Sequence, residues 1–257
     1  MGKERTVVKG LVLRSVDTKE SDKILTVLTA GMGKLPVVAK GARSRRSKVT
    51  AATQLLAYSE LVLSESHGWQ YLSEASTIEL FDGVRQDVEL LSLASYFAEL
   101  TESVTYEESE SGAILSLLLN ALYALGTLQR PQMLVKAAFE MKLMALIGFE
   151  PLLESCAYCG ASRPAEPVLD IQGGVLRCRN CGVGGGKCAL LTPGALEAMR
   201  HVLYGDPRRL YSFTLEPEDQ RRLSQAAESY VNAMLERGFH TLDFYKSLRL
   251  AMPEGST

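Results

Sequence analysis

Four of the five cysteines in the chain form two pairs with the spacing Cys-x-x-Cys. The first pair is Cys156 and Cys159, the second is Cys178 and Cys181, and 18 residues lie between the pairs. Two residues between thiolates place both sulfur atoms on one side of a tight turn, and a following glycine, present after each pair, relieves that turn. Two such turns brought together form a tetrahedral cage of four sulfurs. The spacing therefore predicts one structural Zn²⁺ ion, with no open position for water.

The cysteine spacing is also compatible with a redox pair or with buried thiols that bind no metal. A redox pair would stand in a βαβ context, which the surrounding sequence lacks, and the thiols could also be buried without a metal. The fifth cysteine, Cys188, could replace a ligand or bind a partner. We expect it to be a small buried residue.

A second group of residues suited to chemistry is a basic stretch between Gly31 and Thr50 that contains no acidic residue. Guanidinium and ammonium groups on a flexible segment beside a β surface are suited to phosphate contacts. We therefore predict nucleic-acid binding of low sequence specificity, because nothing in the chain looks like a base-reading helix. A solvated loop is the alternative. The candidate residues are Lys34, Lys40, Arg43, Arg45, Arg46 and Lys48.

The overall charge of the chain hides this basic stretch. The 257 residues carry a formal net charge of −2, with 28 basic and 30 acidic side chains. Residues 1–50 have a net charge of +8, residues 51–120 of −11 and the remainder of +1. An asymmetry of this kind is typical of chains in which one segment contacts a charged partner.

The elements that would position these groups begin with strands. Five segments of β-branched or alternating apolar residues occur in the first eighty residues, with no helix long enough to cover a parallel sheet. They are residues 6–13, 23–29, 35–39, 55–64 and 69–78. Five short strands favour a small closed barrel of the oligonucleotide-binding (OB) type.

Apolar residues then recur at helical spacing over 88–102, 114–125 and 131–148, after Thr192, and from Glu216 to Gly238. Residues 151–190 interrupt the helices with Gly, Cys and Pro and contain a predicted hairpin, 168–171 with 175–177. The fold class is therefore α+β: a five-stranded OB-like β-barrel followed by a mostly α-helical domain with an inserted four-cysteine zinc module. The predicted boundaries are 1–82 for the barrel, 83–150 and 191–250 for the helical domain, and 151–190 for the zinc module.

Aromatic and acidic residues have less specific interpretations. Trp69, Tyr71 and Tyr58 lie on predicted strands and could stack on bases, but we expect core or barrel-end packing. The acidic block is expected to be a solvated helical face, with a docking surface or a repulsive wall as the alternative. It contains Glu99, Glu102, Glu107, Glu108 and Glu110.

Several classes of protein are disfavoured. The chain has no G-x-S-x-G or H-E-x-x-H motif, and its three histidines are far apart, so we expect no enzymatic activity. No apolar run approaches the ~18 residues that span a bilayer, and Met1–Arg5 is polar. Five cysteines are too few for a disulfide scaffold. We therefore expect a cytoplasmic protein without membrane contact.

A series of short motifs runs through the chain in a specific order. The first part contains Val8, Gly10 to Leu13, Glu20 to Thr26, Gly33-Lys34 and Ala39 to Ser47. Past the barrel, Glu140, Leu143 and Leu146 lead to Gly148-Phe149-Glu150-Pro151-Leu152, just before the first cysteine pair. In this order and spacing the chain resembles the bacterial RecO family over roughly residues 5–245. Members of that family differ in whether they keep all four cysteines, and this chain has all four.

The resemblance implies a function and a set of partners. It implies a DNA repair and homologous recombination mediator that binds single- and double-stranded DNA and anneals complementary strands. It also implies action with RecR, a groove for the C-terminal tail of the single-strand-binding protein SSB, help in loading RecA, and a location in the bacterial cytoplasm with the nucleoid. Two alternatives from other classes are a zinc-containing protein-interaction adaptor and an RNA-binding protein with an OB barrel and a zinc module.

Overall fold

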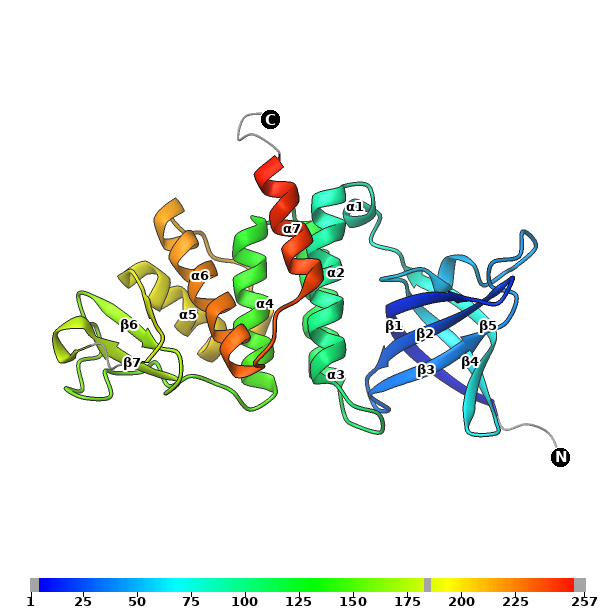
Figure 1. The fold of residues 1–257 in the computed structure, drawn as a ribbon, viewed down its shortest axis with the longest axis horizontal. Coiled ribbons are helices and arrows are strands. Elements are labelled where there is room, and N and C mark those ends of the chain that lie inside the picture. Colours follow the sequence, from blue (N-terminus) through cyan, green and yellow to red (C-terminus); the bar gives the residue numbers. More distant parts are fainter. Residues whose placement is uncertain (1–4, 183–185, 252–257) are drawn as a thin grey trace. The chain divides into compact units, whose positions relative to one another are not determined.

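The computed structural model describes residues 5–182 and 186–251 (Figure 1). The chain divides into two compact units, Met1–Thr127 with Phe239–Thr257, and Leu128–Gly238. The predicted barrel and zinc segments, 1–82 and 151–190, include residues 1–4 and 183–185, which lie outside the described ranges. The predicted helices are distributed over both compact units.

The first unit contains the predicted five-stranded barrel. Its strands are β1 (Arg5–Thr18), β2 (Asp22–Thr29), β3 (Lys34–Ala39), β4 (Tyr58–Ser66) and β5 (Trp69–Glu79). They form a closed barrel in the order β1-β2-β3-β5-β4 (Figure 1). The β3–β5 pairing is parallel and the other four pairings are antiparallel. The structure thus confirms the closed barrel expected from the sequence.

Strand β1 continues to Thr18, beyond the predicted end at Leu13. A register shift between Val12 and Arg14 marks a β-bulge, which bends the strand. The first half of β1 pairs with β4 and the second half with β2. The polar residues after Leu13 conceal this continuation, because they do not show the apolar alternation of a half-buried strand.

The barrel core is formed by alternate residues of the strands. Val12, Leu25, Val37 and Leu61 are completely buried, and the short 3₁₀ helix η1 (Ala51–Thr53) follows the loop after β3. Aliphatic side chains at every second position fill the barrel, and the intervening positions face outward.

The described part of the same unit also contains the helices α1 (Asp82–Arg85), α2 (Val88–Val104), α3 (Gly112–Gly126) and α7 (His240–Ala251). Asp87 is the N-cap of α2: its carboxylate accepts hydrogen bonds from the backbone N–H groups of Glu89 and Leu90 at 2.8 and 3.0 Å. The Glu102 carboxylate joins α2 to the barrel, with Oε1 3.2 Å from Nε of Arg14 and 3.3 Å from Oγ1 of Thr26.

Helix α7 is absent from the predicted elements. Only two of its residues, Leu242 and Tyr245, are buried, so its apolar periodicity is short. Phe239, the residue directly before α7, holds the helix against α2. Its buried ring packs edge-on against the Tyr96 ring of α2 at a centroid distance of 5.5 Å. The backbone N–H of Thr241 also donates to Glu99 at 3.2 Å. The acidic block is therefore partly used in packing and is not uniformly a solvated face.

The second unit contains α4 (Gln132–Leu146), α5 (Pro193–Tyr204) and α6 (Pro217–Met234). Helix α4 carries a buried cation, Lys136, whose Nζ lies 2.8 Å from Glu140 on the same helix and 3.0 Å from Glu228 on α6. Burying a charge requires paired partners of this kind. Among the described residues, none of the helices combines the length and apolarity needed to cross a membrane.

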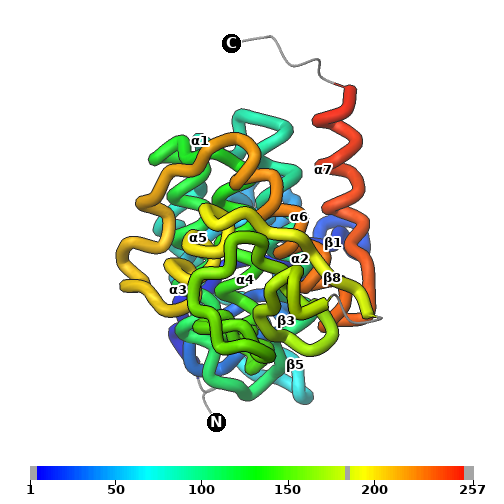
Figure 2. Tube along the Cα trace, turned by 90° about the vertical axis from the view of Figure 1, so that its left-hand side faces the viewer, coloured from blue at the N-terminus to red at the C-terminus, as the bar shows by residue number. Residues whose placement is uncertain are grey.

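The inserted segment of the second unit forms a small sheet. Strands β6 (Pro167–Asp170) and β7 (Val175–Cys178) pair antiparallel, which confirms the predicted hairpin. A third strand, β8 (Cys188–Leu190, labelled in Figure 2), pairs with β6 on its other side and was not predicted. A strand of three residues is too short to show a recognisable period.

Candidate metal centre and nucleic-acid interface

Each cysteine pair lies on a tight turn that ends in a glycine. In the first, the N–H of Gly160 donates to the carbonyl of Cys156 at 2.9 Å. In the second, the short 3₁₀ helix η2 (Arg179–Cys181) follows β7, and the N–H of Gly182 donates to the carbonyl of Arg179 at 3.0 Å. Both glycines have positive φ values, +72° and +85°, as the predicted relief of the turn requires.

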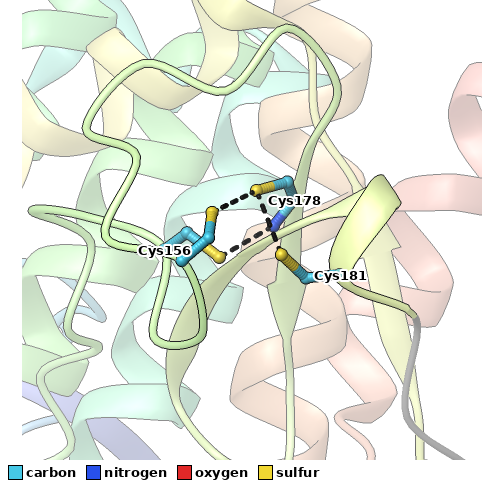
Figure 3. A group of neighbouring side chains, drawn as sticks. Cys156, Cys178 and Cys181 are labelled. Carbon is cyan, nitrogen blue, oxygen red and sulfur yellow. Dashed lines mark hydrogen bonds between the residues drawn. The ribbon is translucent and has the colours of Figure 1, made fainter.

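The two turns bring the four thiols together. The Sγ atoms of Cys156, Cys159, Cys178 and Cys181 all lie within 4.8 Å of one another, and none of these cysteines is in a disulfide. Figure 3 shows the three labelled sulfurs facing a common centre; the Sγ–Sγ distance is 3.2 Å from Cys178 to Cys159 and 3.7 Å from Cys178 to Cys181. A tetrahedral ion with metal–sulfur distances of about 2.3 Å holds its ligands about 3.8 Å apart. The donor set and spacing therefore fit one metal ion.

The electrostatics of Cys156 and Cys178 differ in direction. Burial alone raises the pKa of Cys156, but backbone N–H groups of Cys159, Tyr158 and Cys178 donate to its sulfur, so that its pKa falls to about 6. The pKa of Cys178 is raised, first because its thiol is hydrogen-bonded to Cys159 and Cys156, and then because it is buried. Full ionisation of adjacent thiols is unfavourable without a cation, and a bound cation supplies the missing charge.

Cys188 lies outside this group. It is half-buried on β8, opposite Asp170 of β6, and is not part of the four-thiol cluster. Asp170 in turn pairs with Arg177 at 2.6 Å, and the Arg177 guanidinium stacks over the Tyr158 ring at 4.5 Å. These contacts connect the β6–β7 sheet to the turn between Cys156 and Cys159, and so help to hold that turn in place.

The predicted basic residues lie mainly in the loop after β3. The loop is closed by backbone hydrogen bonds from Ser44 to Gly41 and from Ser47 to Ser44, at 3.0 and 2.9 Å, and it is anchored by the buried Ala42. The side chains that point into solvent are those of Lys40, Arg43, Arg45, Arg46 and Lys48. Within 5–182 and 186–251, the side chains of Arg45, Arg46 and Lys48 have no ion-pair partner.

Lys34 is separated from this loop. It lies at the first residue of β3, and the length of the strand, about 16 Å, lies between it and the loop. Its Nζ donates to the carbonyl of Glu102 at 2.9 Å. The structure thus brings five of the six candidate residues together on one loop and places Lys34 at the other end of the strand.

The chain also matches two family models. The model for the recombination protein O N terminal region matches residues 3–81, and the model for the C terminal region matches residues 85–243. The chain belongs to the RecO family. The boundary between the two matched regions falls at the start of α1, directly after the last barrel strand.

Similar proteins named DNA repair protein RecO occur in several bacteria. The one from Symbiobacterium thermophilum is 34% identical over 251 residues, covering 95% of this chain and 98% of the relative. That from Heliobacterium modesticaldum is 32% identical over 256 residues, covering 96% and 91%. That from Acetivibrio thermocellus is 29% identical over 239 residues, covering 93% and 95%. These RecO relatives therefore match nearly the whole length of the chain.

Two features of this RecO-family barrel differ from the sequence-based expectation. Trp69, for which the sequence predicts core or barrel-end packing, does lie at an end of the barrel, since it begins β5 directly after a turn, but its side chain is 47% exposed and is not packed away. The stretch that contains Arg43 has no acidic residue, but Asp17, which lies outside that stretch, is 3.2 Å from the Arg43 guanidinium. A count of charges within one segment cannot detect a partner contributed by another strand.

Arg85 is a structural residue that the sequence did not reveal. It is the only basic residue between positions 51 and 120. Its guanidinium donates to the carbonyls of Leu80 and Leu55 and to the side chain of Gln54. Partial burial lowers its pKa, although nearby Asp82 opposes this change. It therefore ties the segment before β4 to the chain that leaves β5, and this role needs no DNA contact.

Proposed function

We propose that this protein is a DNA repair and recombination mediator that binds single- and double-stranded DNA and anneals complementary strands. The observation that carries the proposal is the loop after β3. It projects Lys40, Arg45, Arg46 and Lys48 from one end of a closed OB-like barrel into solvent. Membership of a family whose relatives are named DNA repair proteins supports the same conclusion.

The chemistry of binding would be neutralisation of phosphates. Each Lys or Arg that meets a phosphate releases condensed counterions, so affinity falls steeply as the salt concentration rises. The loop is held by its own hydrogen bonds and by Ala42, so the basic side chains are presented on an ordered backbone. Phosphate contacts of this kind carry no sequence information, which suits a protein that must act on any damaged DNA.

Annealing requires no bond-making or bond-breaking by the protein. Cationic side chains that reduce repulsion between two strands allow complementary bases to pair. We therefore propose that the protein is not an enzyme and that its basic loop acts by lowering strand–strand repulsion.

We further infer that the metal at the four cysteines is zinc and that its role is structural. Four thiolates match the ligand preference of Zn²⁺, and four protein ligands close the coordination sphere. The ion would neutralise the thiolates and hold the two turns and the β6–β7 hairpin together. Its binding energy would then be part of the folding energy of this segment.

The proposed partners are RecR, RecA and the C-terminal tail of SSB. In this proposal the protein acts with RecR and helps RecA load on SSB-coated single strands, and it associates with the nucleoid. The support for these partners is membership of the RecO family.

The decisive test is a salt titration of binding to a fluorescent single-stranded oligonucleotide. The wild type is expected to bind at low salt with a steep loss of affinity as salt rises. The triple variant Arg45→Ala, Arg46→Ala, Lys48→Ala is expected to bind more weakly and to show a flatter slope. A control removes the same charge from exposed positions of the other unit, Arg208, Arg209 and Arg221.

The results of this titration distinguish the mediator from the two alternative classes of function. No binding at low salt contradicts the mediator and favours an interaction adaptor. Preferential competition by RNA over DNA favours the RNA-binding alternative. An equal loss of affinity in the control and the loop variant would mean that net charge, and not the loop, determines binding.

A further inference from the structure

An apolar stripe crosses the outer wall of the barrel. Four side chains from four strands lie in direct register: Val16 opposite Ile24, Ile24 opposite Val38, and Val38 opposite Tyr71. Residues in register on adjacent strands have Cβ atoms about 5 Å apart and share one face of the sheet. The stripe therefore runs across β1, β2, β3 and β5 without interruption.

These side chains face away from the barrel core. The sequence neighbours of three of them face inward, since Leu25 and Val37 are fully buried in the core and Leu72 packs against it. Successive residues of a strand point to opposite faces. Val16 and Ile24 are 47% and 38% exposed. Outer-wall positions of a barrel that touches only water are normally polar, so an exposed apolar row marks an interaction surface.

Trp69 extends this row with a large aromatic ring. It lies two residues before Tyr71 on β5, hence on the same face of the strand, and is 47% exposed. The turn before it contains His67 and Gly68, both with positive φ values, and sends β5 back along β4. The stripe therefore lies between the β4–β5 turn and the β1–β2 turn. In OB folds, these two loops and the β2–β3 face bind oligonucleotides.

The charge beside the stripe is positive. The Nζ atom of Lys40 lies 4.7 Å from the centroid of the Tyr71 ring, and the basic loop continues from Lys40. Two nearby carboxylates are already used, because Asp17 pairs with Arg43 and Asp22 accepts the backbone N–H of Gly41 at 2.8 Å. The rings of Trp69 and Tyr71 next to the Lys40 cation suit a ligand that has flat aromatic groups linked by phosphates.

We propose that Trp69 and Tyr71 form a stacking platform for unpaired bases of single-stranded DNA, while Lys40 and the loop after β3 hold the adjoining phosphates. This inference rests on the proposed DNA binding and adds the chemical group that is recognised and the residues that recognise it. Base–aromatic stacking is tolerant of sequence, because every base has a π face. In a duplex, the faces of the bases are covered by their neighbours, so the platform selects single strands over duplexes.

The test uses the fluorescence of Trp69, which is the only tryptophan in the chain. We expect oligo(dT) to quench this fluorescence on binding to the full-length wild type. An abasic oligonucleotide of the same length and charge, or a duplex, should leave it nearly unchanged. Binding is monitored in parallel by the anisotropy of a label on the DNA, so that occupancy is known independently of the tryptophan signal.

Variants separate stacking from phosphate contact. Trp69→Ala and Tyr71→Ala should each weaken single-strand binding between about fivefold and a hundredfold and leave duplex binding unchanged. Trp69→Phe should retain most of the affinity, and it keeps the test valid where the alanine variant does not fold. Tyr106→Ala is the matched control, because Tyr106 is 70% exposed on the loop after α2 and should be neutral.

The possible failures are distinct. Absence of single-strand binding in the anisotropy measurement overturns the proposed DNA binding and this inference together. Normal binding with unchanged Trp69 fluorescence, or equal affinity for abasic and base-containing strands, overturns the stacking platform alone.

Discussion

The guanidinium Nε of Arg43 lies 3.2 Å from a carboxylate oxygen of Asp17, so one cation of the basic loop is partly neutralised by the second half of β1. The same guanidinium also reaches the carbonyl of Glu20 at 3.5 Å. Both partners lie at or near the β1–β2 turn. Arg43 is thus a link between the loop and that turn, whereas Arg45 and Arg46 extend from the loop into solvent.

This pairing predicts unequal effects of single loop substitutions. Arg45→Ala or Arg46→Ala should reduce the slope of log K against log salt for single-stranded DNA by about 0.7 each, because each removes a cation that the proposed function assigns to a phosphate contact. Arg43→Ala should change the slope less, since its charge is already opposed. Asp17→Asn should tighten binding by releasing Arg43. A salt titration of each variant measures these slopes, and an Arg43→Ala effect as large as that of Arg46→Ala contradicts the argument.

Metal removal should unfold the cysteine segment. Freshly purified protein is expected to contain about one equivalent of zinc by elemental analysis, and Cys156→Ser or Cys178→Ser should lose it. The matched control is Cys188→Ser, which should keep the metal because Cys188 is outside the four-thiol cluster. Chelation should expose residues 151–190 to protease while the barrel stays resistant. Less than half an equivalent of metal in the wild type would contradict the zinc site.

A close approach of two glycines should make Gly83 intolerant of substitution. A Cβ atom at Gly83 of α1 would lie 2.3 Å from the backbone carbonyl oxygen of Gly126 at the end of α3. Because backbone must shift to make room, Gly83→Ala is expected to destabilise the protein by about 1–3 kcal/mol in denaturant unfolding. Gly31→Ala is the control: the nearest atom is a flexible side-chain oxygen 4.0 Å away, so its effect should stay within about 0.5 kcal/mol.

The stability of the protein should depend on the charge of Lys136, the buried cation of α4. Lys136→Met removes the ammonium group that lies 2.8 Å from Glu140, a carboxylate with no exposed surface, and should cost about 3–5 kcal/mol. Replacing both groups, as in Lys136→Met with Glu140→Leu, should recover part of that loss, since the fully buried carboxylate is then removed and only Glu228, whose side chain is 21% exposed, loses the ammonium group of Lys136. Urea denaturation of the two variants measures the difference. By contrast, Arg221→Ala, which breaks an exposed pair with Glu218, should leave the midpoint of urea denaturation nearly unchanged.

The sequence predicted those parts of the structure that are determined by residues close together in the chain. Alternating apolar residues such as Leu35, Val37 and Ala39 identified the strands, because burial on one face imposes a period of two. The cysteine spacing likewise identified the four thiols that the fold brings together, since the turns that position them are only a few residues long.

The features that were not predicted depend on contacts between distant residues. Helix α7 is held by Phe239 against Tyr96, and two buried side chains give too short a pattern to identify the helix. The exposure of Trp69 and the neutralisation of Arg43 depend on which strands become neighbours. The barrel order, in which β3 pairs with β5, determines these relationships, and no single segment encodes it.

That order has a consequence for how the barrel moves. Among the described residues, the parallel β3–β5 pairing that closes the barrel comprises two register pairs, Val37 with Gln70 and Val38 with Tyr71, whereas β1 and β4 pair over seven. The free energy of local opening should therefore be lowest at this junction, and its amide protons should exchange with solvent sooner than those between β1 and β4. Val38 and Tyr71 also lie in the outer apolar stripe, so a strand of DNA bound there would span the junction and slow its opening.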